Sequence, residues 1–363
     1  MNIKGNLFVS GIFRSGTTLC TRAMDAHPQI NLVYQPFTPL FKMWRNLYFK
    51  QFVATDFDND LPMGVDWLHS NEDREKFNAM AMRVYFNKEM IGLLKTQLLE
   101  NMSLPDQHEK PQSISKLLNC IEPGNAEKLL RQLMEFVHLS SPDSRTLIVG
   151  AKEIWSEEFF GPIMRLSDFK VVHLLRDPRA VVASRNSGRI LANATNRRKY
   201  PILFILKSWR RSVQYRNRFL GDSSYTSILY EDIVLKSEEN FRELCKWLQI
   251  EFDESMCNPS LYRDGMGFPW NSNSTFKSAR EFNSTSISQW EKVLSDQEIG
   301  VIEFICGAEM DELGYERTVE EPSVEQFLEY EEDRKQITDW LNHDPYILDP
   351  CQKTLQIDRV LGS

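Results

Sequence analysis

The chain has 363 residues, of which 42% are apolar and 26% are charged, and this composition suits one large α/β domain or one domain with insertions. A net charge of −8 argues against nucleic acid as the default partner, although local basic clusters can still bind a small anionic ligand. The sequence has no apolar run of the ~18–20 residues that a membrane span needs, and no signal-like stretch at its N-terminus. We therefore expect a cytoplasmic protein that does not contact a membrane.

The cysteines are scattered along the chain, without a C-x-x-C pair or a neighbouring histidine. This pattern predicts reduced thiols and neither a disulfide framework nor a zinc site, so we expect no bound metal. The six cysteines are Cys20, Cys120, Cys245, Cys257, Cys306 and Cys351.

In chain order, the first predicted unit is a strand over residues 6–11 followed by a helix over residues 16–26. Three prolines then interrupt regular structure between residues 28 and 48 (Pro28, Pro36 and Pro39). From about residue 45 to 145, leucines recur at helical spacing and predict a helical insertion between the core strands.

Three more apolar runs predict strands, over residues 146–152, 169–175 and 225–230. Continuous apolar runs are typical of parallel strands that are covered on both faces. Helices are expected after Ser156, from Pro178, over residues 202–219 and over residues 237–248. The predicted fold class is therefore α/β: a P-loop-like, three-layer fold with a central parallel sheet flanked by helices, plus the helical insertion.

Acidic residues crowd residues 320–333, and Phe327, Tyr330 and Trp340 favour a helix that packs back on the domain. An exposed arm is the alternative. We expect one domain over residues 1–316 and an acidic helical extension over residues 317–363.

The segment from Gly11 to Thr18 reads G-I-F-R-S-G-T-T, with its glycines spaced as in the loop G-x-x-x-x-G-K-[ST] of nucleoside triphosphatases. The lysine that contacts the terminal phosphates is replaced by Thr17, and a cation stands inside the loop as Arg14. Backbone N–H groups from Ser15 onward, at a helix N-terminus, would still bind an anion. The loop therefore predicts a phosphate-like ligand other than a magnesium triphosphate.

A second candidate anion site begins at Arg176, which ends a predicted strand and is followed by Asp177 and Pro178. Ser184 stands eight residues after this arginine, two turns into a predicted helix. The guanidinium supplies a planar two-pronged donor and the serine a hydroxyl, so both can bind one phosphate.

The two motifs, in this order and roughly 150 residues apart, resemble the 5′-phosphosulfate loop and the 3′-phosphate motif of sulfotransferases, which use 3′-phosphoadenosine 5′-phosphosulfate (PAPS). Tyr230-Glu231-Asp232 resembles the R-Y-E-D element of that family, with Leu229 in place of the arginine. Residues 274–278, 286–290 and 313–315 resemble the C-terminal half of the bacterial and tyrosylprotein-type branch. The resemblance spans roughly residues 6–316.

This resemblance implies a sulfotransferase with PAPS as donor, adenosine 3′,5′-bisphosphate (PAP) as product, and no metal. It implies catalytic roles for Arg14 on the bridging and leaving oxygens and for Lys152 on the transferring sulfuryl group. Ser274 is implied as another contact of the sulfuryl group. The implied cofactor contacts are Arg14, Ser15, Gly16, Thr17, Thr18, Arg176, Ser184, Tyr230 and Ser274.

The general base is the point where this chain departs from the family. Relatives often carry a glutamate in the strand after the first helix, where this chain has Gln35, whose amide cannot accept a proton. Glu153, beside Lys152, is the favoured replacement. A histidine (His27 or His69) is a second possibility, and a nitrogen acceptor that needs less help is a third.

The acceptor is expected to be a hydroxyl or an amine of a small molecule, with natural-product tailoring in secondary metabolism as the role. Residues 34–145 and the loop 186–200 are expected to form its site. Candidate aromatics for that site are Phe37, Phe41, Trp44, Trp67, Tyr85 and Trp155, most of which also suit an ordinary core. A PAPS-binding protein without turnover and a nucleotide kinase with a degenerate loop are the rival functions.

Overall fold

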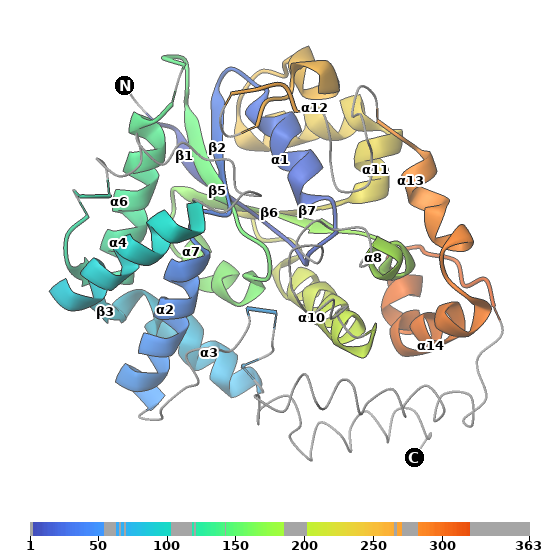
Figure 1. Ribbon diagram of the computed structural model, residues 1–363, viewed down its shortest axis with the longest axis horizontal. Coiled ribbons are helices and arrows are strands. Elements are labelled where there is room, and N and C mark those ends of the chain that lie inside the picture. Colours follow the sequence, from blue (N-terminus) through green and yellow to red (C-terminus); the bar gives the residue numbers. More distant parts are fainter. Residues whose placement is uncertain are drawn as a thin grey trace.

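A parallel five-stranded sheet forms the centre of the molecule (Figure 1). The strands lie in the order β2-β5-β1-β6-β7, and every neighbouring pair is parallel. Their bounds are Gly5–Ser10 (β1), Ile30–Tyr34 (β2), Ile148–Lys152 (β5), Phe169–Leu175 (β6) and Tyr225–Leu229 (β7). The computed structural model describes residues 3–53, 63–64, 67–68, 70–102, 118–119, 121–141, 143–184, 202–264, 267–270 and 282–319.

Strand β1 shows why both faces of the sheet must be covered. Leu7 and Val9 pack in one apolar cluster, whereas Phe8 packs in the other. Successive side chains of a strand point to opposite faces, and each of these three is apolar and buried. The continuous apolar pattern therefore requires a helical layer on each side.

Helices supply those two layers, as Figure 1 shows for α1, α11 and α12 on one side of the sheet and α10 and α14 on the other. The first layer contains α1 (Thr17–Asp25), α11 (Tyr230–Leu235) and α12 (Ser237–Leu248). The second contains α2 (Thr38–Tyr48), α4 (Lys88–Met102), α6 (Ala126–Leu139), α7 (Phe160–Met164), α8 (Pro178–Ser184), α10 (Ile202–Phe219) and α14 (Asp296–Glu312). The predicted α/β fold class is confirmed.

The proline-rich segment after α1 is more regular than its sequence suggests. Strand β2 fits between Pro28 and Pro36 at the edge of the sheet, and Pro39 lies in the first turn of α2. A proline is tolerated there because its missing N–H would have no partner within the helix.

Between β2 and β5 the described chain is mainly helical, with α3 (Asn71–Met80) in addition to α2, α4 and α6. Two short strands there, β3 (Tyr85–Phe86) and β4 (Gly124–Asn125), form an antiparallel pair that the sequence pattern did not predict. Strands of two residues are too short to show a period of two.

The topology places the ends of β1, β2, β5 and β6 at one edge of the sheet, where ligands bind in open α/β folds. Three of the four non-glycine residues with positive φ in the described chain follow these strands: Arg14 (φ 68°), Gln35 (φ 45°) and Trp155 (φ 55°). Such a conformation costs about 1–3 kcal/mol per residue and persists where the surrounding structure enforces it. Backbone strain thus collects at the carboxyl edge.

Short α13 (Thr285–Ser288) and α14 complete the described chain, which ends at residue 319. The predicted acidic extension lies outside the described residues from position 320 onward. None of the described helices combines the length and apolarity that crossing a bilayer requires.

Candidate functional site

The loop between β1 and α1 presents an uncapped helix N-terminus. Gly16 has φ 89°, and a Cβ there would overlap the ring of Tyr230, so this position suits only glycine. Among the described residues, no side chain caps α1 and no acidic residue lies in its first turn. The first N–H groups of α1, at Thr17 and Thr18, have no acceptor inside the helix and are available to an anion.

The side chain of Ser15 is fully buried and stabilises the loop. Its Oγ donates a hydrogen bond to the carbonyl of Ile12 (2.7 Å), and its backbone N–H bonds the same carbonyl (3.3 Å). We infer that the hydroxyl of Ser15 fixes the shape of the loop that would bind the anion.

Arg176 leaves the end of β6 and is only 4% exposed. Its Nη1 donates to the carbonyl of Arg14 (3.2 Å) and its Nη2 to the carbonyl of Ser286 (2.8 Å). The guanidinium stacks 4.1 Å from the centre of the Tyr230 ring. Its Nε has no hydrogen-bond partner within the part of the chain that the structure describes.

The two sequence motifs meet in space. Nη2 of Arg14 donates to Oγ of Ser184 (3.3 Å), and the ring of Tyr230 contacts both Gly16 and Arg176. The structure therefore brings together Arg14 to Thr18 of the loop with Arg176, Ser184 and Tyr230, all proposed from the sequence.

Positive charge is concentrated where these motifs meet. Burial and then the neighbouring positive charge of Arg176 lower the pKa of Arg14 to about 10. Each effect disfavours the charged form of Arg14, and a bound anion would offset both. Groups whose pKa is shifted by burial and by a specific neighbour mark candidate functional sites.

Lys152 lies at the same edge, where it pairs with Val9 of β1 and Tyr34 of β2 in the sheet register. Its side chain is buried, and Nζ donates a hydrogen bond to Oε1 of Gln35. Gln35 is held by its backbone, because its N–H donates to the carbonyl of Lys152 (2.7 Å) and its carbonyl accepts from Nδ2 of Asn101 (2.7 Å). Gln35 thus contacts Lys152 directly.

Glu153 points to the other face of the sheet. Its Oε1 accepts the backbone N–H of Phe37 (2.6 Å) and its Oε2 accepts the hydroxyl of Thr38 (2.7 Å), at the N-terminus of α2. Burial raises the pKa of Glu153 to about 7, and the hydrogen bonds from Thr38 and Phe37 oppose that rise. Its role as a base stays a prediction.

The topology argues against His27 as the general base. His27 lies between the C-terminus of α1 and the start of β2, so it is at the opposite edge of the sheet from the loop. Its ring nitrogens bond the carbonyl of Glu251 (2.8 Å) and the N–H of Gln29 (3.0 Å), which are structural contacts. His69 and Ser274 fall outside the described residues.

Most of the proposed acceptor-site aromatics are core residues. Phe37, Phe41, Trp44 and Trp67 are at most 2% exposed, whereas Tyr85 is 53% exposed. Trp155 is different, because it follows β5 and its ring lies 5.1 Å from that of Phe13 in the loop after β1. This aromatic pair therefore lies beside the candidate anion site. The loop 186–200 lies outside the described residues.

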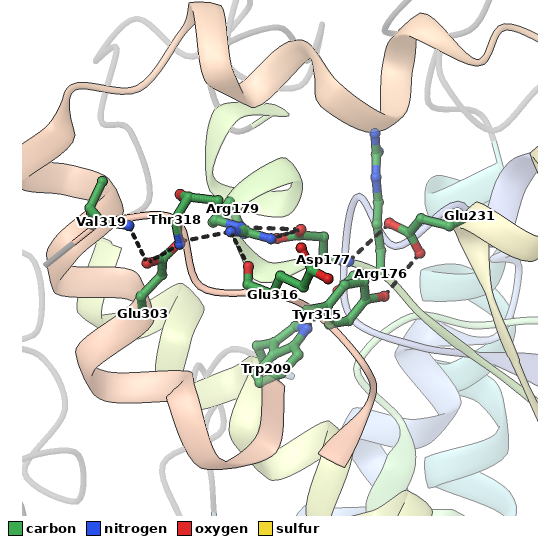
Figure 2. A network of polar contacts seen from close by, with 10 residues as sticks. All are labelled: Arg176, Asp177, Arg179, Trp209, Glu231, Glu303, Tyr315, Glu316, Thr318 and Val319. Atoms are coloured by element: carbon green, nitrogen blue, oxygen red, sulfur yellow. Dashed lines mark hydrogen bonds and ion pairs between the residues drawn. The ribbon is translucent and has the colours of Figure 1, made fainter. Parts of the chain in front are cut away.

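A buried polar network holds the turn that carries Arg176 (Figure 2). Arg179 forms ion pairs with Asp177 and with Glu303 of α14, each at 2.7 Å, and stacks 4.0 Å from the ring centre of Trp290. The backbone carbonyl of Arg176 accepts from Nε1 of Trp209 (2.7 Å). Buried contacts therefore fix the backbone of Arg176 and of the residues that follow it.

The segment after α14 completes this network, as the dashed lines in Figure 2 show. Glu303 accepts the N–H of Thr318 (2.9 Å) and of Val319 (3.1 Å). The hydroxyl of Tyr315 donates to Glu231 (2.9 Å), whose other oxygen accepts the N–H of Asp177 (3.1 Å). Residues 315–319 therefore form a strap that closes over the Arg176 turn.

Removing the carboxylate of Glu303 should release this strap. We expect Glu303→Ala to lower the free energy of unfolding by about 3 kcal/mol, because Arg179 loses a buried ion-pair partner and two N–H groups lose their acceptor. Urea unfolding measures the loss. Glu312→Ala is the matched control, since that carboxylate is 43% exposed and its ion pair with Arg216 should contribute less than about 1 kcal/mol. Equal losses for both variants would contradict the assigned role of the strap.

Sequence reasoning missed two charged residues near the site. Arg22 of α1 is 4% exposed and packs on the ring of Tyr34, 3.1 Å from the ring centre. Its only sequence signal was a charge set among apolar and small residues. Glu303 gave no signal, because its partner Arg179 is 124 positions away along the chain.

The described thiols and carboxylates give no sign of a metal centre. Cys20, Cys245, Cys257 and Cys306 are free cysteines. Across the described ranges, no group of three His, Cys, Asp or Glu side chains is arranged to hold a metal ion.

Comparisons with known proteins agree with the geometry. A model of the sulfotransferase family matches residues 6–254. The chain is similar in structure to a sulfotransferase domain from the curacin biosynthetic pathway, with 15% identity, 88% of this chain and 100% of that chain covered, and a TM-score of 0.50. It is equally similar to the sulfotransferase domain of the Synechococcus PCC 7002 olefin synthase (15% identity, 87% and 97% covered, TM-score 0.50). No curated protein matches the sequence.

Proposed function

The chain belongs to the sulfotransferase family, and from this premise we propose that it transfers the sulfuryl group of PAPS to a hydroxyl or an amine of a small-molecule acceptor. The sequence-based expectation that the acceptor is a natural product belongs to the same proposal. Membership in this family argues against the nucleotide-kinase alternative.

The observation that carries the proposal is the meeting of two anion sites. The uncapped N-terminus of α1 would bind the 5′-phosphosulfate, and Arg176 with Ser184 would bind the 3′-phosphate. These sites share contacts through Arg14 and Tyr230, so one nucleotide with phosphates at two positions can bridge them. A nucleotide without a 3′-phosphate would leave Arg176 unused.

The residues at the site also suit sulfuryl transfer itself. By analogy with phosphoryl transfer, the transition state is loose, with charge on the sulfuryl oxygens and on the leaving 5′-phosphate oxygen. We assign Arg14 to the bridging and leaving oxygens and Lys152 to the sulfuryl oxygens. A sulfuryl group carries a single negative charge, so side-chain cations held in a preorganised site can supply the needed stabilisation.

Calorimetry with PAP tests the donor assignment, and transfer of labelled sulfate from PAPS to a panel of hydroxyl and amine acceptors tests the activity. We expect PAP to bind and ATP to bind more weakly, because ATP lacks the 3′-phosphate that Arg176 would contact. Tighter binding of ATP than of PAP would favour the kinase. PAP binding without transfer to any acceptor would favour a binding protein that lacks turnover.

A further inference from the structure

We propose that Lys152, in its neutral form, accepts the proton that the acceptor loses during sulfuryl transfer, while Gln35 holds its Nζ in place. This inference rests on the proposed function and adds a second role for the same side chain. It follows from how the three polar side chains at the ends of β2 and β5 are connected.

The side chains of Gln35 and Glu153 are less suited to accept the proton. The amide of Gln35 cannot take up a proton, and its Oε1 already accepts from Nζ of Lys152. Both carboxylate oxygens of Glu153 accept hydrogen bonds at the N-terminus of α2, on the opposite face of the sheet. In the described part of the chain no carboxylate forms an ion pair with Lys152. Its Nζ is therefore the group at this edge that is placed to receive a proton.

The surroundings favour the neutral amine. Lys152 is 5% exposed, and burial lowers its pKa to about 7. Burial is the largest of the effects that give this value; the carboxylate of Glu153 at the end of β5 opposes it, and the positive charge of Arg22 on α1 adds to it. From β2, the neutral amide of Gln35 faces Lys152. Lysines that are desolvated beside another cation are known to act as neutral amines near pH 7.

The guanidinium of Arg22 is buried against the ring of Tyr34. Nε and Nη1 of its guanidinium are buried without a hydrogen-bond partner among the residues described, and the group stacks on Tyr34. The carboxylate of Asp25 accepts the N–H of Leu32 (2.8 Å). Burial raises the pKa of Asp25 to about 6, and the hydrogen bond from Leu32 and the charge of Arg22 oppose that rise. The positive charge of Arg22 acts on Asp25 and also on Lys152, and it lowers the pKa of both groups.

The acceptor oxygen forms a bond to sulfur, and the bond between sulfur and the 5′-phosphate oxygen of PAPS breaks, so that its electron pair leaves on PAP. The proton of the acceptor hydroxyl moves to the lone pair of Nζ, and the amine becomes an ammonium. Gln35 Oε1 accepts a hydrogen bond from either form. The new positive charge lies beside the sulfuryl oxygens, where it stabilises the developing anion.

The titration of Lys152 tests this directly and requires no acceptor. Nuclear magnetic resonance of protein with isotope-labelled lysine reports the protonation of each amine through its Cε shift, and Lys152→Arg identifies the signal by removing it. Before PAP is added to the sample, we expect Lys152 to titrate near pH 7. In Gln35→Glu the carboxylate pairs with the ammonium, so we expect the pKa to rise by roughly two units or more.

A pKa of Lys152 above about 9 in the unaltered protein, or one that Gln35→Glu leaves in place, would overturn the assignment. Failure of PAP to bind in the same samples would instead contradict the proposed function. The pKa of Lys152 and the binding of PAP are measured independently, so the two failures can be told apart.

The pH dependence of turnover distinguishes Lys152 from Glu153. A base that acts as a neutral amine gives a kcat that rises with pH up to its pKa and is then constant. If Lys152 is the base, the Glu153→Gln variant still shows a kcat that rises with pH. In the Gln35→Glu variant the rise moves to higher pH, because the pKa of Lys152 is higher there. If kcat of Glu153→Gln no longer rises with pH, Glu153 and not Lys152 accepts the proton of the acceptor.

Discussion

Arg176→Ala is expected to raise the Kd for PAP by about 10²–10³-fold, because it removes a buried two-pronged donor from the 3′-phosphate. Within the described part of the chain the side chain makes two hydrogen bonds, both to backbone carbonyls, and its Nε has no partner there. Calorimetry with PAP measures the change. Binding of AMP, which lacks the 3′-phosphate, should change much less.

Two further variants make this result interpretable. Arg176→Lys keeps the charge but loses the fork, so we expect an intermediate loss of PAP affinity. Arg242→Ala is the distant control, because Arg242 is 54% exposed and pairs with Glu238 on the surface of α12. An Arg176→Ala protein that still binds PAP within about tenfold of the unaltered chain would remove Arg176 from the 3′-phosphate site.

The core strands were predictable because their apolar runs are continuous. The prediction of residues 169–175 coincides with β6, Phe169–Leu175, which is central in the sheet and covered on both faces. Strand β2 was harder to assign, because it is a short edge strand between prolines. The pair β3 and β4 could not be seen at all, since two residues carry no period.

The same distinction applies to the site. The residues after β1 and β6 that we propose to bind the nucleotide belong to local motifs, so their spacing along the chain identifies them. The contact between Lys152 and Gln35 depends on the register of β2 against β5, in which Tyr34 pairs with Lys152. The burial of Arg22 and the strap at Glu303 depend on tertiary packing. The spacing of residues along the sequence gives no information on strand register or on tertiary packing.

Arg14→Ala is expected to lower the rate of sulfuryl transfer at saturating PAPS by about 10³-fold, which is typical when an arginine that stabilises transition-state charge is removed. PAP should still bind within about tenfold, because the helix N-terminus and Arg176 remain. The carbonyl of Arg14, which holds Arg176, is kept in the variant. Transfer of labelled sulfate in a single turnover measures the rate of the chemical step.

The stability of the same variant separates a catalytic role from a structural one. Burial and the charge of Arg176 lower the pKa of Arg14 to about 10, so the folded protein disfavours this charge while the unfolded chain does not. Removing it should leave the free energy of unfolding unchanged or higher by about 1 kcal/mol, even though turnover falls. Arg14→Lys, which keeps a charge without the fork, should recover part of the rate. A variant that loses rate and stability together would show that Arg14 holds the loop, and a rate within tenfold of the unaltered chain would remove Arg14 from the chemistry.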